Sequence, residues 1–161
     1  MGICSNSNTT LRSSSIARSN TSQIQRTIDF ITEIGHREVA ILGLSFKVGT
    51  DDLRESPLVI MAETLLGKGF KLAIHDSDVE LTRLTGANKR FLEEKLPHIN
   101  SLLSASLEEV VAGSKTLVVC KNASEYRELL QLISPHHHIV DLAAVLKSAT
   151  IPKAQYHGLY W

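Results

Sequence analysis

The fold of this chain is decided by the stretch Ile41-Leu-Gly-Leu-Ser-Phe-Lys-Val-Gly-Thr-Asp-Asp-Leu-Arg-Glu-Ser-Pro57. The apolar run from Val39 to Leu44 predicts a buried β-strand, and Pro57 suits the first turn of a following helix, where its missing N–H is not needed. The loop between them carries five charged side chains: Lys47, Asp51, Asp52, Arg54 and Glu55. A buried strand, a charged loop and a helix N-terminus, in that order, are how an α/β domain presents a phosphate site.

Lys47 and Arg54 are the candidate binding residues of this loop. They are seven residues apart, so they can hold two different anions or two parts of one large ligand. The competing interpretation is a solvated loop in which both cations pair with Asp51, Asp52 and Glu55. We expect Asp51 and Asp52 to shape the loop by accepting backbone N–H groups rather than to perform acid–base chemistry.

Segments typical of strands and of helices alternate along the rest of the chain. Strands are expected at 39–44, 70–75, 116–120 and 138–142, helices at 16–34, 56–67, 76–84, 106–113 and 124–132, and a last extended segment at 157–160. The third strand is almost wholly apolar, which predicts burial on both faces. The alternation implies right-handed crossovers and a mostly parallel sheet. We therefore predict an α/β fold, a three-layer Rossmann-like parallel sheet with helices on both faces, preceded by one long helix.

Ligands in such sheets bind beyond the carboxyl ends of the strands, where the strand order reverses. The Lys47 loop and the loop at 121–124 both follow strands, so we expect them to form the rims of one cleft. A dinucleotide site also needs G-x-G-x-x-G after the first strand, and only Gly43 and Gly49 are present there. Asp76 stands where a ribose-binding acid would, but without the glycines we favour a role in capping the next helix. The domain alone is not expected to be the primary NAD site.

The overall composition narrows the class of protein. A chain of 161 residues is long enough for one domain with a real core, and its 17 basic and 17 acidic side chains balance. The zero net charge gives no electrostatic reason to expect nucleic acid or an anionic membrane as a partner. No apolar run approaches the ~20 residues that span a bilayer. Cys4 and Cys120 lack CxxC spacing, which favours a reducing, cytoplasmic compartment. Three adjacent histidines at 136–138 cannot all face one ion from a regular strand, so we expect a surface turn and no metal site.

The charged loop also carries a family resemblance. The segment Phe46–Pro57 resembles the signature of the C-terminal domain of the UDP-glucose/GDP-mannose dehydrogenases, and Arg18–Gln25 resembles that family's Arg-Ser-Asn-x-x-Gln helix. The resemblance covers roughly residues 15–161. Three smaller matches favour the GDP-mannose branch of the family, which serves alginate biosynthesis: Gly86–Lys89, Pro97-His98 and Trp161.

The resemblance implies roles for single residues. Lys47 would contact the nucleotide sugar, GDP-mannose, and Arg54 the diphosphate of NAD where the cofactor meets this domain. A compact ammonium suits a sugar oxygen or phosphate, and a forked guanidinium suits a diphosphate. The pair Glu125-Tyr126 loosely matches an aromatic position beside the nucleotide base, with core packing or helix capping as the alternatives. The family's thioester-forming cysteine lies in a Gly-Gly-x-Cys-x-Pro-Lys-Asp segment, and these 161 residues contain no such segment.

The resemblance also implies a division of the chain. Residues 1–14 would be a disordered or expression-derived tail, residues 15–35 the end of a central dimerisation helix, and residues 36–161 the nucleotide-sugar-binding domain. The parent enzyme would be a homodimeric, NAD-dependent 6-dehydrogenase whose remaining domains are partners of this one, and we expect this chain alone to be inactive. Two other interpretations stay open: the same domain of a UDP-sugar dehydrogenase, and a free-standing, non-catalytic nucleotide-binding module.

Overall fold

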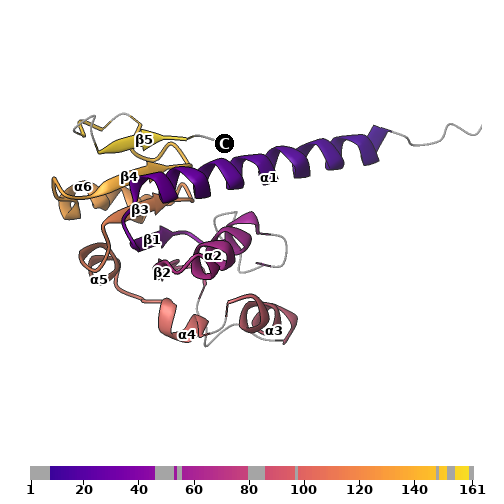
Figure 1. The fold of residues 1–161 in the computed structure, drawn as a ribbon, viewed down its shortest axis with the longest axis horizontal. Coiled ribbons are helices and arrows are strands. Elements are labelled where there is room, and N and C mark those ends of the chain that lie inside the picture. The colour runs from indigo at the N-terminus through magenta and orange to yellow at the C-terminus, as the bar shows by residue number, and fades with distance from the viewer. Residues whose placement is uncertain are drawn as a thin grey trace, which may run out of the picture.

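A computed structural model of the chain describes residues 8–45, 53, 56–79, 86–96, 98–147, 149–151 and 155–159. Figure 1 shows the order of its helices and strands. In chain order they are α1 (Asn8–Ile34), β1 (Glu38–Leu42), α2 (Pro57–Gly67), β2 (Lys71–His75), α3 (Gly86–Lys95), α4 (Ile99–Leu102), α5 (Leu107–Ala112), β3 (Thr116–Val119), the 3₁₀ helix η1 (Ser124–Glu128), α6 (Leu129–Leu132), β4 (His138–Asp141) and β5 (Tyr156–Gly158).

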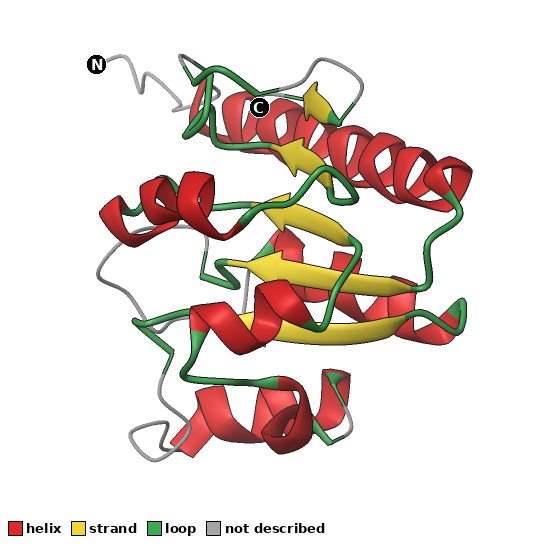
Figure 2. Ribbon diagram, turned by 90° about the vertical axis from the view of Figure 1, so that its left-hand side faces the viewer, coloured by secondary structure: helices red, strands yellow, loops and turns green. Residues whose placement is uncertain are grey.

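The described strands form one parallel sheet in the order β2-β1-β3-β4-β5. Figure 2 shows helices on both of its faces. Helices α1 and α2 pack on one face, and α5 and α6 pack on the other. The prediction of a three-layer, Rossmann-like parallel sheet preceded by a long helix is therefore confirmed.

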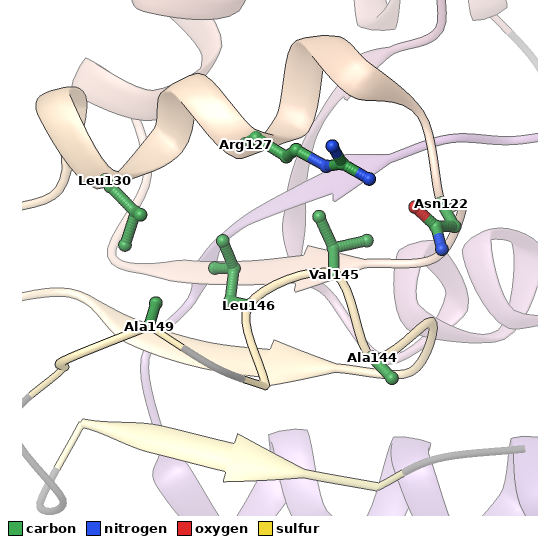
Figure 3. A pocket seen from close by; sticks show the side chains of 7 residues that line it. All are labelled: Asn122, Arg127, Leu130, Ala144, Val145, Leu146 and Ala149. Atoms are coloured by element: carbon green, nitrogen blue, oxygen red, sulfur yellow. The ribbon is translucent and has the colours of Figure 1, made fainter.

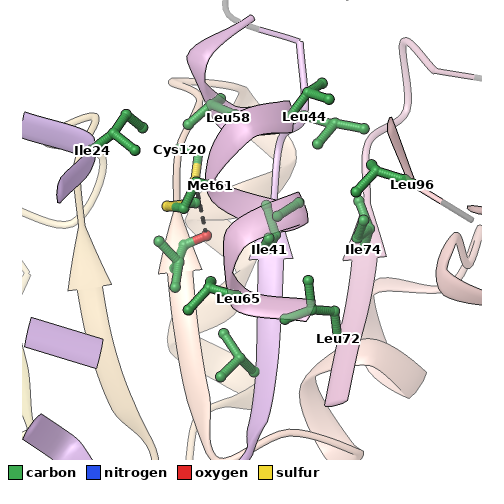
Figure 4. Packing of buried hydrophobic residues seen from close by; sticks show 14 of the residues in the cluster. Ile24, Ile41, Leu44, Leu58, Met61, Leu65, Leu72, Ile74, Leu96 and Cys120 are labelled. Carbon is green, nitrogen blue, oxygen red and sulfur yellow. Dashed lines mark hydrogen bonds between the residues drawn. The ribbon is translucent and has the colours of Figure 1, made fainter. Parts of the chain in front are cut away.

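Two cores form because side chains alternate across β1. Val39 and Ile41 point into the core shared with α1 and α2, which Figure 4 shows around Leu58, Met61 and Leu65. Ala40 and Leu42 point to the opposite face, into the core shared with α5 and α6. Strand β3 is buried along its whole length, as its apolar sequence predicts for a central strand.

Helix α1 folds back over the sheet. Its stripe of Ile24, Ile28 and Ile31 is buried in the same core as α2, and the helix extends well beyond the sheet edge in Figure 1. It begins at Asn8, earlier than the expected start at 16.

The segment after β2 differs from expectation. A helix was expected at 76–84, but residues 77–78 form a turn, residues 80–85 lie outside the described part of the chain, and α3 begins at Gly86. The Asp76 carboxylate accepts the N–H of Asp78 (3.0 Å), which closes this turn. The same carboxylate also accepts N–H groups of the segment that follows β1, as described below.

The three adjacent histidines are only partly a surface turn. His136 is exposed, and His137 is buried with its Nδ1 accepting the N–H of Ser134 (2.9 Å). His138 instead begins β4, where its ring lies 4.9 Å from that of His36 and 6.0 Å from that of His157. The described residues contain no group of three or more His, Cys, Asp or Glu that would hold a metal ion. The three rings are therefore a packed cluster that joins the start of β1 to β4 and β5.

We expect this cluster to make stability depend on pH. Burial, followed by the neighbouring His138, lowers the pKa of both His36 and His157, and Lys115 adds to the lowering at His36 against an opposing effect of Glu38. The histidines of the unfolded chain have pKa values of about 6.5, so as the pH falls the unfolded chain binds protons at a higher pH than the folded cluster does. The contribution of the neutral cluster to the free energy of unfolding should be fully present above the unfolded pKa. It should be lost as the pH falls through the lowered pKa values of the folded chain.

The measurement is the urea midpoint between about pH 7.5 and about pH 5.5, a window in which histidines titrate and most carboxylates do not. The double variant His36→Gln with His157→Gln should flatten the dependence. A wild-type midpoint that stays constant over this window would contradict the expectation.

Candidate functional site

The carboxyl ends of β1, β2 and β3 meet where the strand order reverses. From β1 the chain passes through α2 to β2 on one side, and it later returns to β3 on the other side. In open α/β sheets this is the position of the ligand crevice. The side chains that follow the three strands therefore define the candidate site.

Asp76 follows β2 and is completely engaged by the protein itself. Its Oδ2 accepts the N–H of Leu44 (2.7 Å), the N–H of Ser45 (2.8 Å) and the hydroxyl of Ser45 (2.9 Å). Its Oδ1 accepts from the N–H of Asp78 and from the ammonium of Lys121. The carboxylate is buried and has no lone pair left for a ribose hydroxyl, so it does not fit the ribose-binding role that the sequence already disfavoured.

Lys121 reaches Asp76 from the loop that follows β3. Its Nζ also donates to Asp78 Oδ2 (2.9 Å) and Ser45 Oγ (3.1 Å), and its side chain is 1% exposed. One ammonium thus faces two carboxylates, and each of its three protons has an oxygen partner. The expected cleft rim at 121–124 is therefore closed at Lys121, which fills the space between β1 and β3.

Gly43 lets this lysine approach the backbone. It has a φ of +97°, and a Cβ placed on it would lie 2.5 Å from Lys121 Cβ and 3.2 Å from Lys121 N. In a dinucleotide fingerprint a glycine at this turn lets the backbone approach a pyrophosphate. Here the protein's own side chain takes that space. The described residues therefore do not fit a primary NAD site, in agreement with the incomplete glycine pattern.

Tyr126 belongs to the core rather than to a surface that meets a base. Its hydroxyl donates to the carbonyl of His75 (2.9 Å), and its side chain is buried against α5 and α6. Beside it, Glu125 Oε1 accepts from the hydroxyl of Ser77 (2.9 Å). Of the alternatives left open by the sequence, core packing is the one observed for Tyr126.

The four site residues proposed from the sequence, Lys47, Asp51, Asp52 and Arg54, lie outside the described residues. The two ends of their loop are described, and they are joined: the hydroxyl of Ser56 donates to the carbonyl of Leu44 (2.8 Å). Ser56 also caps α2 by accepting the N–H of Leu58 (3.3 Å), with Pro57 at the first helical position as predicted. Leu53, within the loop, is fully buried.

A pocket of about 570 Å³ opens between the loops that follow β3 and β4. Figure 3 shows Arg127 and Asn122 on its upper side and the segment from Ala144 to Leu146 opposite them. That segment is fixed by the buried carboxylate of Asp141, which accepts the N–H groups of Ala143, Val145 and Leu146. The pocket combines apolar walls with the guanidinium of Arg127, and Asn122 brings the loop at 121–124, which was expected to border a cleft, to its rim.

Cys120 offers no nucleophile. It is buried at the end of β3, its thiol donates to the carbonyl of Val118 (3.5 Å), and burial raises its pKa far above the ordinary value. A thiol of raised pKa stays protonated and is a poor nucleophile. Among the helices of the described residues, none is long and apolar enough to cross a membrane.

The fold and the charged loop together define the class of protein. The chain belongs to the UDP-glucose/GDP-mannose dehydrogenase family: its residues 40–148 match that family's UDP binding domain.

Several curated relatives are GDP-mannose 6-dehydrogenases. The chain is 44% identical over 147 residues to the enzyme of Pseudomonas syringae pv. tomato. This aligned region covers 91% of this chain and 34% of the relative. It is 46% identical to the enzyme of Pseudomonas aeruginosa over the same share of the chain and 33% of that relative. It is 30% identical over 121 residues to the UDP-glucose 6-dehydrogenase of Rickettsia prowazekii, which covers 73% of the chain and 26% of that relative. The chain spans about a third of the length of the GDP-mannose 6-dehydrogenases that it matches.

Solved structures agree with these relatives. A ternary complex of GDP-mannose dehydrogenase from Pseudomonas aeruginosa matches with a TM-score of 0.76 and 46% identity, over 88% of this chain and 32% of that one. A UDP-glucose dehydrogenase from Pyrobaculum islandicum matches with a TM-score of 0.61 and 21% identity, over 89% of this chain and 30% of that one, and it supports the fold alone.

Proposed function

We propose that this chain is the nucleotide-sugar-binding domain of an NAD-dependent GDP-mannose 6-dehydrogenase, which oxidises GDP-mannose to GDP-mannuronate with two NAD. The observation that carries the proposal is the difference in identity between the two groups of relatives. The similarity to GDP-mannose 6-dehydrogenases is 42–46% over at least 91% of the chain, against 28–30% for the UDP-glucose enzymes over 70–73% of it. We propose further that the parent enzyme is a cytoplasmic homodimer that serves alginate biosynthesis.

Within this function the domain binds and orients rather than reacts. Lys47 would hold an oxygen of the nucleotide sugar, Asp51 and Asp52 would shape the loop around it, and Arg54 would contact the NAD diphosphate from the loop's far end. The main NAD contacts and the reactive cysteine would come from other parts of the parent enzyme, since the described residues offer neither a dinucleotide crevice nor a reactive thiol. This division predicts that the 161-residue chain binds substrate without turning it over.

The test of substrate class is calorimetric titration of the purified chain with GDP-mannose, UDP-glucose and NAD. We expect GDP-mannose to bind more tightly than UDP-glucose, and NAD to bind weakest because Asp76 and Lys121 close the crevice. GDP and UDP are the matched controls, since they separate recognition of the base from recognition of the sugar. Tighter binding of UDP-glucose would favour the alternative of a UDP-sugar dehydrogenase. The family domain that the chain matches is described as a UDP binding domain, which is consistent with that alternative. Binding of none of the ligands would contradict the proposal.

The test of the loop is Lys47→Ala. Losing a direct charged contact to a phosphate should cost about 1.5–3 kcal/mol, so GDP-mannose should bind tenfold or more weakly, about one to two decades. Lys115→Ala is the matched control, because that lysine is exposed at the amino end of β3, away from the strand ends that carry the loop, and pairs only loosely with Glu38 (3.9 Å). Arg54→Ala should affect this binding much less and should instead raise the Michaelis constant for NAD in the complete enzyme. Unfolding by Lys47→Ala without a separate binding defect would show that the lysine is structural.

A further inference from the structure

The proposed function leaves one feature unused, the ion pair buried at the switch point. The side chains of Lys121 and Asp76 are 1% and 0% exposed. Removing two charges from water is costly, and a buried pair of this kind seldom adds stability over well-packed apolar side chains. A role in fixing one arrangement of the backbone explains such a pair better than a role in stability does.

The pair joins three strand ends that are distant in sequence. Ser45 follows β1, Asp76 follows β2, and Lys121 follows β3. Asp76 accepts the backbone N–H groups of Leu44 and Ser45, which follow β1. Lys121 donates to the hydroxyl of Ser45 (3.1 Å). The direction in which the chain leaves β1 is therefore set by Asp76 and Lys121 as well as by the sheet.

Both ends of the segment that carries Lys47 are held at this point. Ser45 is the last described residue before that segment, and it bonds Asp76 and Lys121 directly. Ser56 closes the segment by donating to the carbonyl of Leu44 (2.8 Å), whose own N–H is held by Asp76 (2.7 Å). A movement of Leu44 and Ser45 therefore displaces both the start and the end of the candidate binding loop.

We propose that Lys121 is a positioning residue: with Asp76 and Ser45 it fixes the point where the loop bearing Lys47 leaves the sheet, and so it sets the affinity of that loop for a nucleoside diphosphate sugar. The ligand part of this inference rests on the proposed function. The backbone part does not, because it concerns only described contacts. Lys121 itself is enclosed by the protein and does not touch the ligand.

The first experiment needs no ligand. Hydrogen–deuterium exchange of the full chain, resolved by NMR, would compare wild type with Lys121→Met, and with Lys115→Met as the matched surface control. The amides of Leu44 and Ser45 should exchange about tenfold faster in Lys121→Met, since their acceptor, Asp76, loses its buried partner. The amides of Ala40 and Ile41, inside the sheet, should keep their protection. Unchanged exchange at Leu44 and Ser45 in the folded variant would overturn the inference.

The second experiment is a double-mutant cycle on GDP-mannose affinity. Lys121→Met should weaken binding about tenfold, as a displaced phosphate contact would. If Lys121 acts through the loop, its loss should matter little once Lys47 is alanine, so the double variant should bind only slightly more weakly than Lys47→Ala alone. Effects that multiply fully would show an independent, merely structural role and would overturn the inference.

If Lys121→Met does not fold, Ser45→Ala takes its place in both experiments. It removes only the hydroxyl that joins Lys121 to Asp76 and leaves the charge pair intact. A smaller acceleration of exchange, with the same non-additivity toward Lys47→Ala, supports the inference, and wild-type behaviour in both overturns it. A wild-type chain that binds no nucleotide sugar would contradict the proposed function, and the exchange data would still decide the role of Lys121.

Discussion

Replacing Asp76 with alanine should lower the free energy of unfolding by about 4 kcal/mol, the range found when one partner of a buried pair is removed. The substitution leaves the Lys121 ammonium enclosed with only Asp78 as a carboxylate partner (2.9 Å). It also removes the acceptor of the Leu44 and Ser45 N–H groups, which become buried and unsatisfied. Urea unfolding followed by circular dichroism measures the change.

Two variants separate these contributions. Asp76→Asn keeps an oxygen that can accept the two N–H groups but removes the charge, so it should fall between wild type and Asp76→Ala. Asp29→Ala is the surface control, because Asp29 is exposed on α1, where it accepts from the Gln25 amide (2.8 Å). It should change stability by less than about 0.5 kcal/mol. Equal effects of Asp76→Ala and Asp29→Ala would show that the buried network contributes nothing to the fold.

The sheet could be predicted from sequence because its central strands are buried on both faces. A run such as Thr116-Leu-Val-Val has no polar face to accommodate water, and the helices between such runs force parallel pairing. Local signals at helix starts were equally readable. Pro57 stands at the first position of α2 as predicted, and Ser106, three residues before Glu109, caps α5 as its spacing predicts.

The contacts at the strand ends could not be predicted in the same way. Lys121 and Asp76 are 45 residues apart, and their meeting depends on β1 lying between β2 and β3. The sequence places each residue after a strand but does not give the strand order. One signal was available: a lysine directly after a wholly apolar strand has little access to water, which indicates a buried partner. The cluster of His36, His138 and His157 was missed for the same reason, because it joins β1, β4 and β5.

Strand order also explains the role of Asp76, for which the sequence favoured capping of the next helix over binding of a ribose. After β2, an acidic residue can cap the next helix or bind a ribose, and both interpretations assume that its carboxylate is free. The neighbouring end of β1 uses it first, through the N–H groups of Leu44 and Ser45. Tertiary contacts thus outweighed a local preference that was correct in kind, since Asp76 does accept the N–H of Asp78.

Gly43→Ala should also destabilise the chain by about 4 kcal/mol, for a different reason. The φ of +97° disfavours any side chain, which costs about 1–2 kcal/mol. The added Cβ would then lie 2.5 Å from Lys121 Cβ, and neither atom can move without shifting the ends of β1 or β3. Overpacking of this kind costs about 1–3 kcal/mol more.

Gly69→Ala is the matched control for this prediction. Gly69 has a similar φ of +81°, but a Cβ placed there would meet no atom within 4 Å. It should therefore show only the conformational cost, and the difference between the two variants should be about 2 kcal/mol, the part due to Lys121. Urea unfolding of both variants under the same conditions measures that difference directly. If the two glycines cost the same, the ends of β1 and β3 can separate freely, and Lys121 cannot be fixing where the candidate binding loop leaves the sheet.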